Sequence, residues 1–265
     1  MKKHIKFDKG DIVYHDTGEG YPLVLLHGYL ETSLVWKEFA ETLSGDFRIL
    51  AIDLPGHGGS SVYGTEHSME FMAEAVRRVL DAGNIDKFML AGHSMGGYVA
   101  LAFVEKYPHR LYAYCLFHSH PFPDTEELIA NRRREIKVVE SGKKDIIYPV
   151  NIPRMFADFN TVKFKEALER NKLIASGISE EGIIAVLNGM ISRPSRLGIL
   201  EKGEVPLLFI AGKHDNYIPF EEVNNRIKFP ANVGMLVLEE SGHMGFVEEK
   251  EKSLGAIRNF YRGQL

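Results

Sequence analysis

Gly92-His93-Ser94-Met95-Gly96 is the stretch of this sequence that decides the fold. An apolar run at residues 88–91 precedes it, and a helix-like run at residues 98–107 follows it. A Gly-x-Ser-x-Gly pentapeptide between a strand and a helix predicts a strained turn that presents the serine hydroxyl to an open site. The flanking glycines keep neighbouring chain from clashing in such a turn. Ser94 is therefore the predicted nucleophile, with a purely structural turn as the alternative.

A serine nucleophile needs a base and a group that orients the base. Asp215 lies in a turn directly after the apolar run at residues 206–211, and His243 lies on a loop after a second such run at 234–238. Each of the three residues therefore follows a different predicted strand. The pattern predicts that Ser94 attacks, that His243 takes and returns the proton, and that Asp215 fixes the imidazole.

Other residues compete for these roles. Asp124 is the rival acid, but it lies farther behind its strand than Asp215 does. His93 and His214 are direct neighbours of the nucleophile and the acid, so their side chains are expected to point elsewhere. We therefore expect both histidines to be packing or surface residues.

Two backbone donors are also needed to hold the oxyanion that forms during acyl transfer. One is the amide of Met95, which follows the nucleophile and begins the helix. The other is expected after the strand at residues 23–26, where His27 and Gly28 precede Tyr29. The sequence predicts the Tyr29 amide as this donor, with Gly28 permitting close approach. An ordinary turn at this place is the alternative.

Together these motifs resemble those of the α/β-hydrolase superfamily. The similarity lies in the serine-nucleophile branch with carboxylesterases, enol-lactonases, cofactor-free haloperoxidase and perhydrolase-type enzymes, and C–C bond hydrolases. The matches span residues 23–245. They comprise His27-Gly28, Trp36, Asp53-Leu54-Pro55-Gly56-His57-Gly58-Gly59-Ser60, the pentapeptide around Ser94, Asp215 with Pro219, and Gly242-His243.

Strand-like and helix-like segments alternate along the chain, which predicts an α/β fold with a mainly parallel sheet and helices on both faces. The alternation stops between residues 119 and 196, where helical patterns occur at 126–139, 161–174 and 180–190. The resemblance implies that this insertion is a helical cap placed before the acid-bearing strand. We therefore predict a hydrolase core at residues 1–118 and 197–265 with a cap at 119–196.

Within the predicted cap, Met155, Phe156 and Phe159 are candidates for lining the substrate pocket. Apolar side chains dominate the walls of most small-molecule pockets. The alternative is that this cluster is the small core of the helical layer itself.

Composition agrees with one globular enzyme domain. The 265 residues are 45% hydrophobic and 26% charged, and the net charge of −4 argues against nucleic acid or an anionic membrane as partner. No secretory signal or membrane-spanning stretch is evident. The single cysteine, Cys115, indicates a reducing compartment and a buried position, so we expect a cytoplasmic protein.

No cofactor or metal is expected. His118 and His120 could share one face of a strand, but no neighbouring carboxylate or cysteine completes a set of metal ligands. The predicted partner is therefore a small-molecule substrate alone, and the sequence carries no prediction of oligomeric state.

A serine triad with an oxyanion hole performs acyl transfer. The leading hypothesis is a serine hydrolase that cleaves a small carboxylic ester or lactone through an acyl-enzyme intermediate. C–C bond hydrolysis, peroxyacid formation and aminopeptidase action on the same triad stay open, as does a ligand-binding receptor with slow turnover. The resemblance disfavours haloalkane dehalogenases and epoxide hydrolases, which carry an aspartate at this turn.

Overall fold

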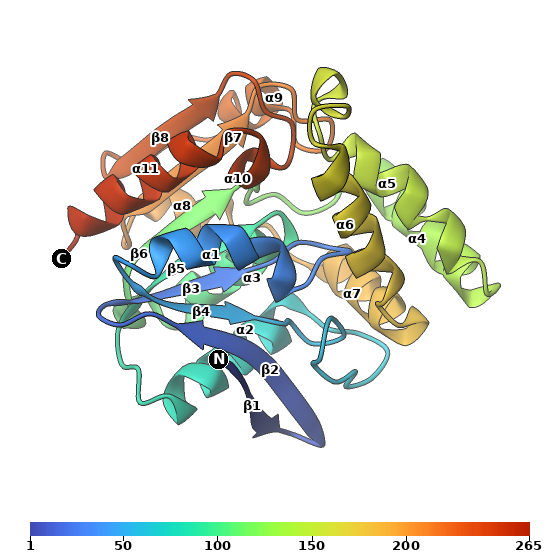
Figure 1. Cartoon of the computed structure of the whole chain (residues 1–265), viewed down its shortest axis with the longest axis horizontal. Helices are drawn as coiled ribbons and strands as arrows, with labels where there is room; N and C mark the ends of the chain where they lie inside the picture. Colours follow the sequence, from blue (N-terminus) through green and yellow to red (C-terminus); the bar gives the residue numbers. More distant parts are fainter.

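A sheet of eight strands runs through the centre of the computed structural model, which describes residues 1–265 (Figure 1). The strand order is β1-β2-β4-β3-β5-β6-β7-β8. The pairs β1–β2 and β2–β4 are antiparallel and all the others are parallel, as predicted. The strands are β1 (Lys2–Phe7), β2 (Gly10–Thr17), β3 (Pro22–Leu26), β4 (Arg48–Ile52), β5 (Phe88–His93), β6 (Leu111–Phe117), β7 (Leu207–Gly212) and β8 (Val233–Leu238).

The central strands are continuous apolar runs because the sheet is covered on both faces. Every residue of β5 and β7 is buried. The parallel register pairs Leu26 with Gly92, His93 with Phe117, and Gly212 with Leu238. These strands therefore end side by side, and the loops that follow them meet at one edge of the sheet.

Helices cover both faces of the sheet (Figure 1). The segments α1 (Lys37–Leu43) and α11 (Lys250–Arg262) lie in front in this view, and α2 (Met69–Ala82), α3 (Met95–Lys106) and α8 (Leu197–Lys202) lie behind. The front layer packs around Trp36, whose ring centroid lies 4.3 Å from that of Phe246. Two short helices, α9 (Phe220–Asn224) and α10 (Gly245–Glu248), complete the core.

Five helices lie between β6 and β7 in the chain, and all but α8 form the group at the right of Figure 1. Three helices of this group occupy the stretches predicted to be helical, but the fourth, α5, was not predicted. Its Pro149 and Pro153 weaken the helical pattern of a seven-residue segment. The boundaries of the cap at residues 119 and 196 stay a prediction. The helices of this group are α4 (Glu126–Glu140), α5 (Tyr148–Arg154), α6 (Lys165–Ser176) and α7 (Glu180–Ser192).

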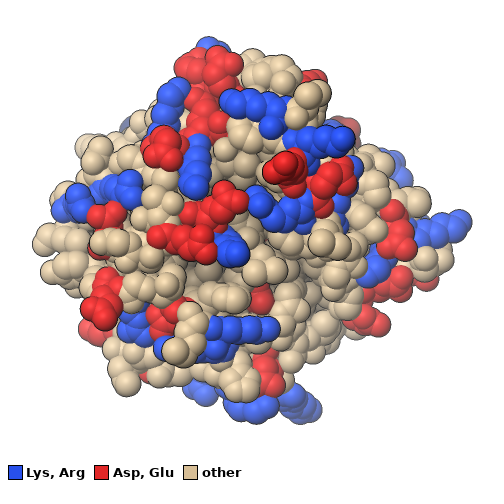
Figure 2. Space-filling view, in the orientation of Figure 1, with Lys and Arg blue, Asp and Glu red and all other residues tan.

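The surface carries charges of both signs, and Lys and Arg are interspersed with Asp and Glu on the face seen in Figure 2. No single helix is both long and apolar enough to cross a bilayer. Only α6 and α7 taken together reach the required length and composition, and they are bent by 98° to one another. Cys115 is fully buried in β6, and burial raises the pKa of its thiol, so this cysteine is a packing residue.

Two glycines let α7 lie directly on backbone of the core. A Cβ atom added to Gly182 would be 2.1 Å from the Gly56 carbonyl oxygen, and one added to Gly189 would be 1.8 Å from that of His67. The contact is held by a hydrogen bond of 2.8 Å from the His67 amide to the Ala185 carbonyl. The position of α7 therefore depends on the absence of side chains at these two residues.

Gly189→Ala should lower the free energy of unfolding by about 1–3 kcal/mol, because α7 must move away from the core. Gly198→Ala is the matched control, since Gly198 is an exposed helical glycine with nothing within 4 Å of an added Cβ. It should raise stability by about 0.4–1 kcal/mol. Urea unfolding measures both changes. Equal effects of the two substitutions would contradict the close contact at Gly189.

Candidate active site

Ser94 lies in a strained turn between β5 and α3. Its φ of 49° and ψ of −114° are unusual for a residue with a side chain. Backbone passes close to both flanking glycines, so the turn is possible only because they have no side chain. A Cβ on Gly92 would lie 2.2 Å from the Gly96 carbonyl oxygen, and one on Gly96 would lie 2.6 Å from the Leu26 carbonyl oxygen. The two glycines flanking the serine thus have the role that the pentapeptide predicts.

Asp215 and His243 come together at the same edge of the sheet. Asp215 Oδ1 accepts hydrogen bonds from the amides of Tyr217 at 2.8 Å and Ile218 at 2.9 Å, so the turn after β7 fixes its own carboxylate. The other oxygen, Oδ2, lies 2.7 Å from His243 Nδ1. Burial alone would raise the pKa of Asp215, but the two histidine rings beside it hold that pKa below its ordinary value.

A second histidine contacts the same carboxylate oxygen, and the sequence did not predict it. His118 Nδ1 lies 3.2 Å from Asp215 Oδ2, and the amides of Gly212 and Gly245 lie 3.1 Å from Nδ1 and Nε2 respectively. A neutral imidazole accepts at only one nitrogen. A proton on Nδ1 gives the carboxylate a donor, so we assign the acceptor to Nε2, which takes the Gly245 N–H. His118 then holds Asp215 from the side opposite its own turn.

Burial lowers the pKa of His118 to about 4, although the Asp215 carboxylate opposes this shift. The unfolded chain therefore binds a proton at this residue at a higher pH than the folded protein does. The contribution of neutral His118 to the free energy of unfolding is therefore complete above the ordinary histidine pKa of about 6.5. It is lost as the pH falls from there toward about 4.

Between pH 6.5 and 4, the free energy of unfolding of His118→Asn should fall by about 3 kcal/mol less than that of the wild type. Asparagine suits the site because it tolerates the φ of 50° at this position. Urea titrations across this pH range give the slope, with the exposed His109→Asn as control. An unchanged slope in His118→Asn would show that this ring is protonated in the folded protein.

Glu31 and His93 form a buried pair behind the nucleophile. Glu31 Oε2 lies 2.9 Å from His93 Nδ1 and accepts a 2.6 Å hydrogen bond from the Gly28 amide, while His93 Nε2 lies 2.8 Å from the His243 carbonyl oxygen. Burial would lower the pKa of His93, but the Glu31 carboxylate raises it. Burial would raise the pKa of Glu31, but His93 lowers it. Each ring nitrogen of His93 faces an acceptor, which is the hydrogen-bonding pattern of an imidazolium paired with a carboxylate, so His93 is neither base nor simple packing.

Glu31→Ala should lower the free energy of unfolding by about 3–5 kcal/mol, because it leaves the buried His93 ring without its counterion. The exposed Glu41→Ala should leave the urea midpoint unchanged, since no side-chain contact of Glu41 is present. A loss in Glu31→Ala no larger than in this control would contradict a charged pair.

The two amides predicted as oxyanion donors have no acceptor within the protein. Met95 is the first residue of α3, where backbone amides have no acceptor within the helix. The Tyr29 amide donates to no other group of the protein. A Cβ on Gly28 would lie 3.2 Å from Ser94 Cβ, so glycine brings this loop against the nucleophile. Direct contact of an oxyanion with the two amides stays a proposal.

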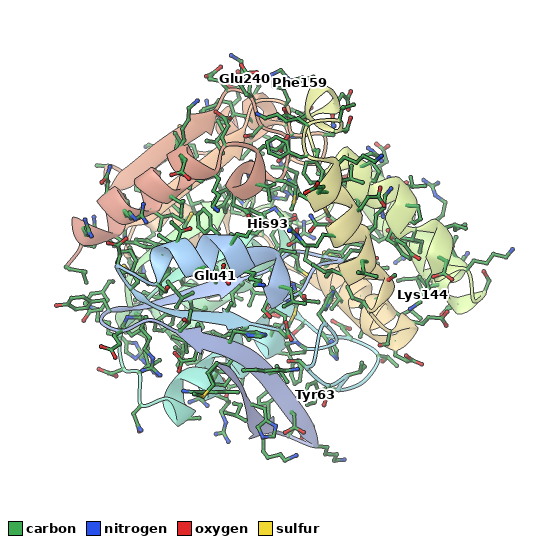
Figure 3. All side chains as sticks on the ribbon, viewed as in Figure 1. Glu41, Tyr63, His93, Lys144, Phe159 and Glu240 are labelled. Atoms are coloured by element: carbon green, nitrogen blue, oxygen red, sulfur yellow. The ribbon has the colours of Figure 1, made fainter.

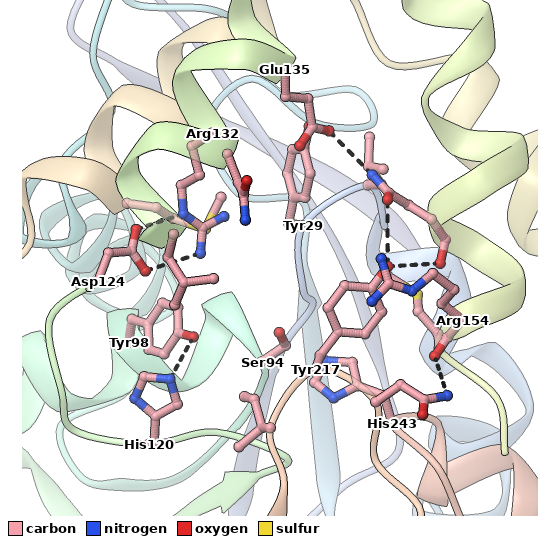
Figure 4. A pocket seen from close by; sticks show the side chains of 18 of the residues that line it. Tyr29, Ser94, Tyr98, His120, Asp124, Arg132, Glu135, Arg154, Tyr217 and His243 are labelled. Carbon is pink, nitrogen blue, oxygen red and sulfur yellow. Dashed lines mark hydrogen bonds and ion pairs between the residues drawn. The ribbon is translucent and has the colours of Figure 1, made fainter. Parts of the chain in front are cut away.

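A cavity of about 430 Å³ contains Ser94 and His243 and lies under the cap. In Figure 4, Ser94 stands at its base, between Tyr98 and His120 on one side and Tyr217 and His243 on the other. Polar and charged side chains from α4 and α5 form much of the wall. The labelled lining residues are Tyr29, Ser94, Tyr98, His120, Asp124, Arg132, Glu135, Arg154, Tyr217 and His243.

The three pocket candidates from the cap have different positions. Met155 lines the cavity as expected. Phe156 is fully buried and stacks with Phe164, with ring centroids 6.5 Å apart, so it belongs to the cap core. Phe159 is 54% exposed and lies at the periphery near Glu240, whereas His93 lies in the interior (Figure 3). The expectation that Phe156 and Phe159 line this cavity is therefore not met, because neighbouring residues of a short irregular segment point in different directions.

The rival acid Asp124 is engaged elsewhere. Its carboxylate contacts Arg132 at 2.6 Å and Arg193 at 2.8 Å. His214, the other weighed histidine, packs its ring edge-on against Phe159. Neither residue contacts His243.

One group of side chains has the spacing of metal ligands. Potential ligand atoms of His118, Asp215 and His243 lie within 4.8 Å of one another. His120 is not part of this group, since its Nε2 contacts the Tyr98 hydroxyl at 3.3 Å. A metal here would compete with the His243–Asp215 contact, because Asp215 Oδ2 already receives both rings.

Comparisons with known proteins agree with this geometry. A family model described as alpha/beta hydrolase fold matches residues 21–250. The chain is 26% identical to the pimeloyl-[acyl-carrier protein] methyl ester esterase of Aeromonas hydrophila, over 92% of this chain and 96% of that protein. The chain therefore belongs to the α/β-hydrolase fold family, and it is an esterase-like hydrolase.

Solved structures show the same likeness. The thermophilic esterase of Thermogutta terrifontis, solved with malate bound, is 30% identical with a TM-score of 0.93, covering 100% of this chain and 99% of that one. The enol-lactonase of Burkholderia xenovorans is 19% identical with a TM-score of 0.88, over 97% of this chain and 99% of that one. The latter similarity concerns the fold alone.

Proposed function

We propose that this protein cleaves a small carboxylic ester or lactone through an acyl-enzyme intermediate on Ser94. The observation that carries the proposal is the 2.7 Å contact between Asp215 Oδ2 and His243 Nδ1, with His243 and Ser94 lining the same cavity. The names of two esterases among the similar proteins, at 30% and 26% identity, support the choice of an ester bond.

In the proposed mechanism, His243 Nε2 takes the Ser94 proton as the hydroxyl attacks the ester carbonyl. Asp215 keeps the proton of His243 on Nδ1 and stabilises the imidazolium that forms. The amides of Tyr29 and Met95 hold the oxyanion until the alcohol leaves with the proton from His243. Water then repeats the same steps on the acyl-enzyme and releases the acid.

Ser94→Ala should abolish ester hydrolysis and fluorophosphonate labelling while leaving the fold intact. His243→Ala should be about as damaging, because the residues of a triad act as a unit. Hydrolysis of graded p-nitrophenyl esters and lactones measures activity, and mass spectrometry locates the label. Undiminished labelling of Ser94→Ala would place the nucleophile elsewhere, and binding without turnover in the wild type would favour the receptor alternative.

The acid is tested by a matched pair of substitutions. Asp215→Asn should lower kcat about 10⁴-fold, because the wrong tautomer of His243 is then favoured. Asp124→Asn removes an equally buried carboxylate that contacts only arginines, and should reduce kcat far less. If Asp124→Asn were the more harmful change, the assignment of Asp215 would be wrong.

A further inference from the structure

Two arginines share one carboxylate in the wall of the active-site cavity. The side chain of Asp124 is fully buried. Its carboxylate accepts hydrogen bonds from Arg132 Nε at 2.6 Å and from Arg132 Nη2 at 3.3 Å. Arg193, whose side chain is only 2% exposed, contacts Asp124 Oδ1 through Nη1 at 2.8 Å, the same oxygen that Arg132 Nη2 contacts. The cluster therefore carries one positive charge more than its carboxylate neutralises.

Arg193 lies behind the wall, with its Nε and Nη2 buried and without partners, whereas Arg132 lies at the cavity itself. The guanidinium of Arg193 stacks on the Tyr98 ring at 4.0 Å and donates to the Met190 carbonyl at the end of α7. Arg132 makes no hydrogen bond other than to Asp124. Its guanidinium lines the same cavity as Ser94. Arg132 Nη1 has no hydrogen-bond partner in the protein, and a guanidinium with a free donor beside a cavity is a natural partner for an anion.

The remaining charges of the cavity do not remove this excess. Glu135, one turn after Arg132, already accepts from the Tyr29 hydroxyl at 2.7 Å and from Asn151 at 3.2 Å. Arg154 adds another guanidinium, which lies 5.2 Å from the centre of the Tyr217 ring. Three arginines thus face two carboxylates in and directly behind this wall: Arg132, Arg154 and Arg193 against Asp124 and Glu135.

We propose that Arg132 is a specificity-determining residue that binds a carboxylate of the substrate. The inference rests on the proposed ester hydrolysis at Ser94 and narrows its substrate class. Asp124 holds the guanidinium through Nε and Nη2, which leaves Nη1 directed to a ligand in a fixed orientation. The substrate is then a monoester of a short dicarboxylic acid, or a lactone that carries a free carboxylate.

The position of the subsite fits this class. Ser94 and Arg132 lie on different walls of one cavity, the first on the hydrolase core and the second on α4 (Figure 4). The cavity volume of about 430 Å³ suits a small molecule with a reactive ester at one end and an anion at the other. A neutral ester of the same length would leave the Nη1 donors of Arg132 without an anionic partner.

The experiment compares matched esters. The methyl hydrogen esters of four-, five- and six-carbon dicarboxylic acids are each paired with the methyl ester of the monocarboxylic acid of equal length, and methanol release gives kcat/KM. In the wild type, at least one pair should favour the anionic ester by about tenfold or more. Arg132→Gln should lower this ratio by about 10- to 100-fold.

Arg133→Gln is the control, because Arg133 is an exposed neighbour on α4 outside the cavity. Its ratio of kcat/KM for the anionic ester to kcat/KM for the neutral ester should equal that of the wild type. If Arg132→Gln does not fold, Arg132→Lys keeps the charge but loses the paired donors, and it should still lower the ratio. A wild-type ratio of one or less for every pair, or an unchanged ratio in the folded Arg132 variant, overturns the subsite.

The two proposals fail in different ways. Hydrolysis of the neutral esters without preference for the anionic ones rejects the carboxylate subsite and keeps the esterase mechanism. Absence of hydrolysis with every ester, together with absence of fluorophosphonate labelling at Ser94, rejects the proposed mechanism itself.

Discussion

The buried pair of Glu31 and His93 is the constraint on which the site depends. Glu31 holds the Gly28 amide of the oxyanion loop, and His93 reaches the backbone carbonyl of His243. One carboxylate and one imidazole thus join three loops that follow different strands. Separating two buried charges is costly, so the contacts of Glu31 Oε2 and of both His93 nitrogens favour one relative position of the loops, although Glu31 Oε1 has no partner. Small shifts of any loop would leave a buried charge unpaired.

Asp215, the proposed acid of the triad, is positioned by a second and separate set of contacts. Asp215 is oriented by the amides of its own turn and by His118 on the neighbouring strand end. The nucleophile depends on backbone strain at Ser94 and the His243 loop on the Glu31–His93 pair. The three residues are therefore fixed by different forces, which meet only because their strands end at the same edge of a parallel sheet.

The sequence predicts the features that depend on local signals. Continuous apolar runs identify β5 and β7, and the flanking glycines identify the turn at Ser94. The functions of Glu31 and His118 could not be predicted, because their partners lie 62 and 97 residues away in the chain. Phe156 and Phe159 show the same limit, since an irregular segment has no periodicity that tells which side chain faces a cavity.

The cap contributes to the core as well as covering it. Glu135 of α4 accepts a hydrogen bond from the hydroxyl of Tyr29, whose backbone amide is the proposed oxyanion donor. Arg132, one turn earlier on the same helix, is bound to Asp124, which follows β6. A single helix therefore contacts both the loop that would hold the oxyanion and the wall that would bind a substrate anion. Because α4 is fixed at both points, the charge proposed to select the substrate and the amide proposed to hold the oxyanion are kept at a constant separation.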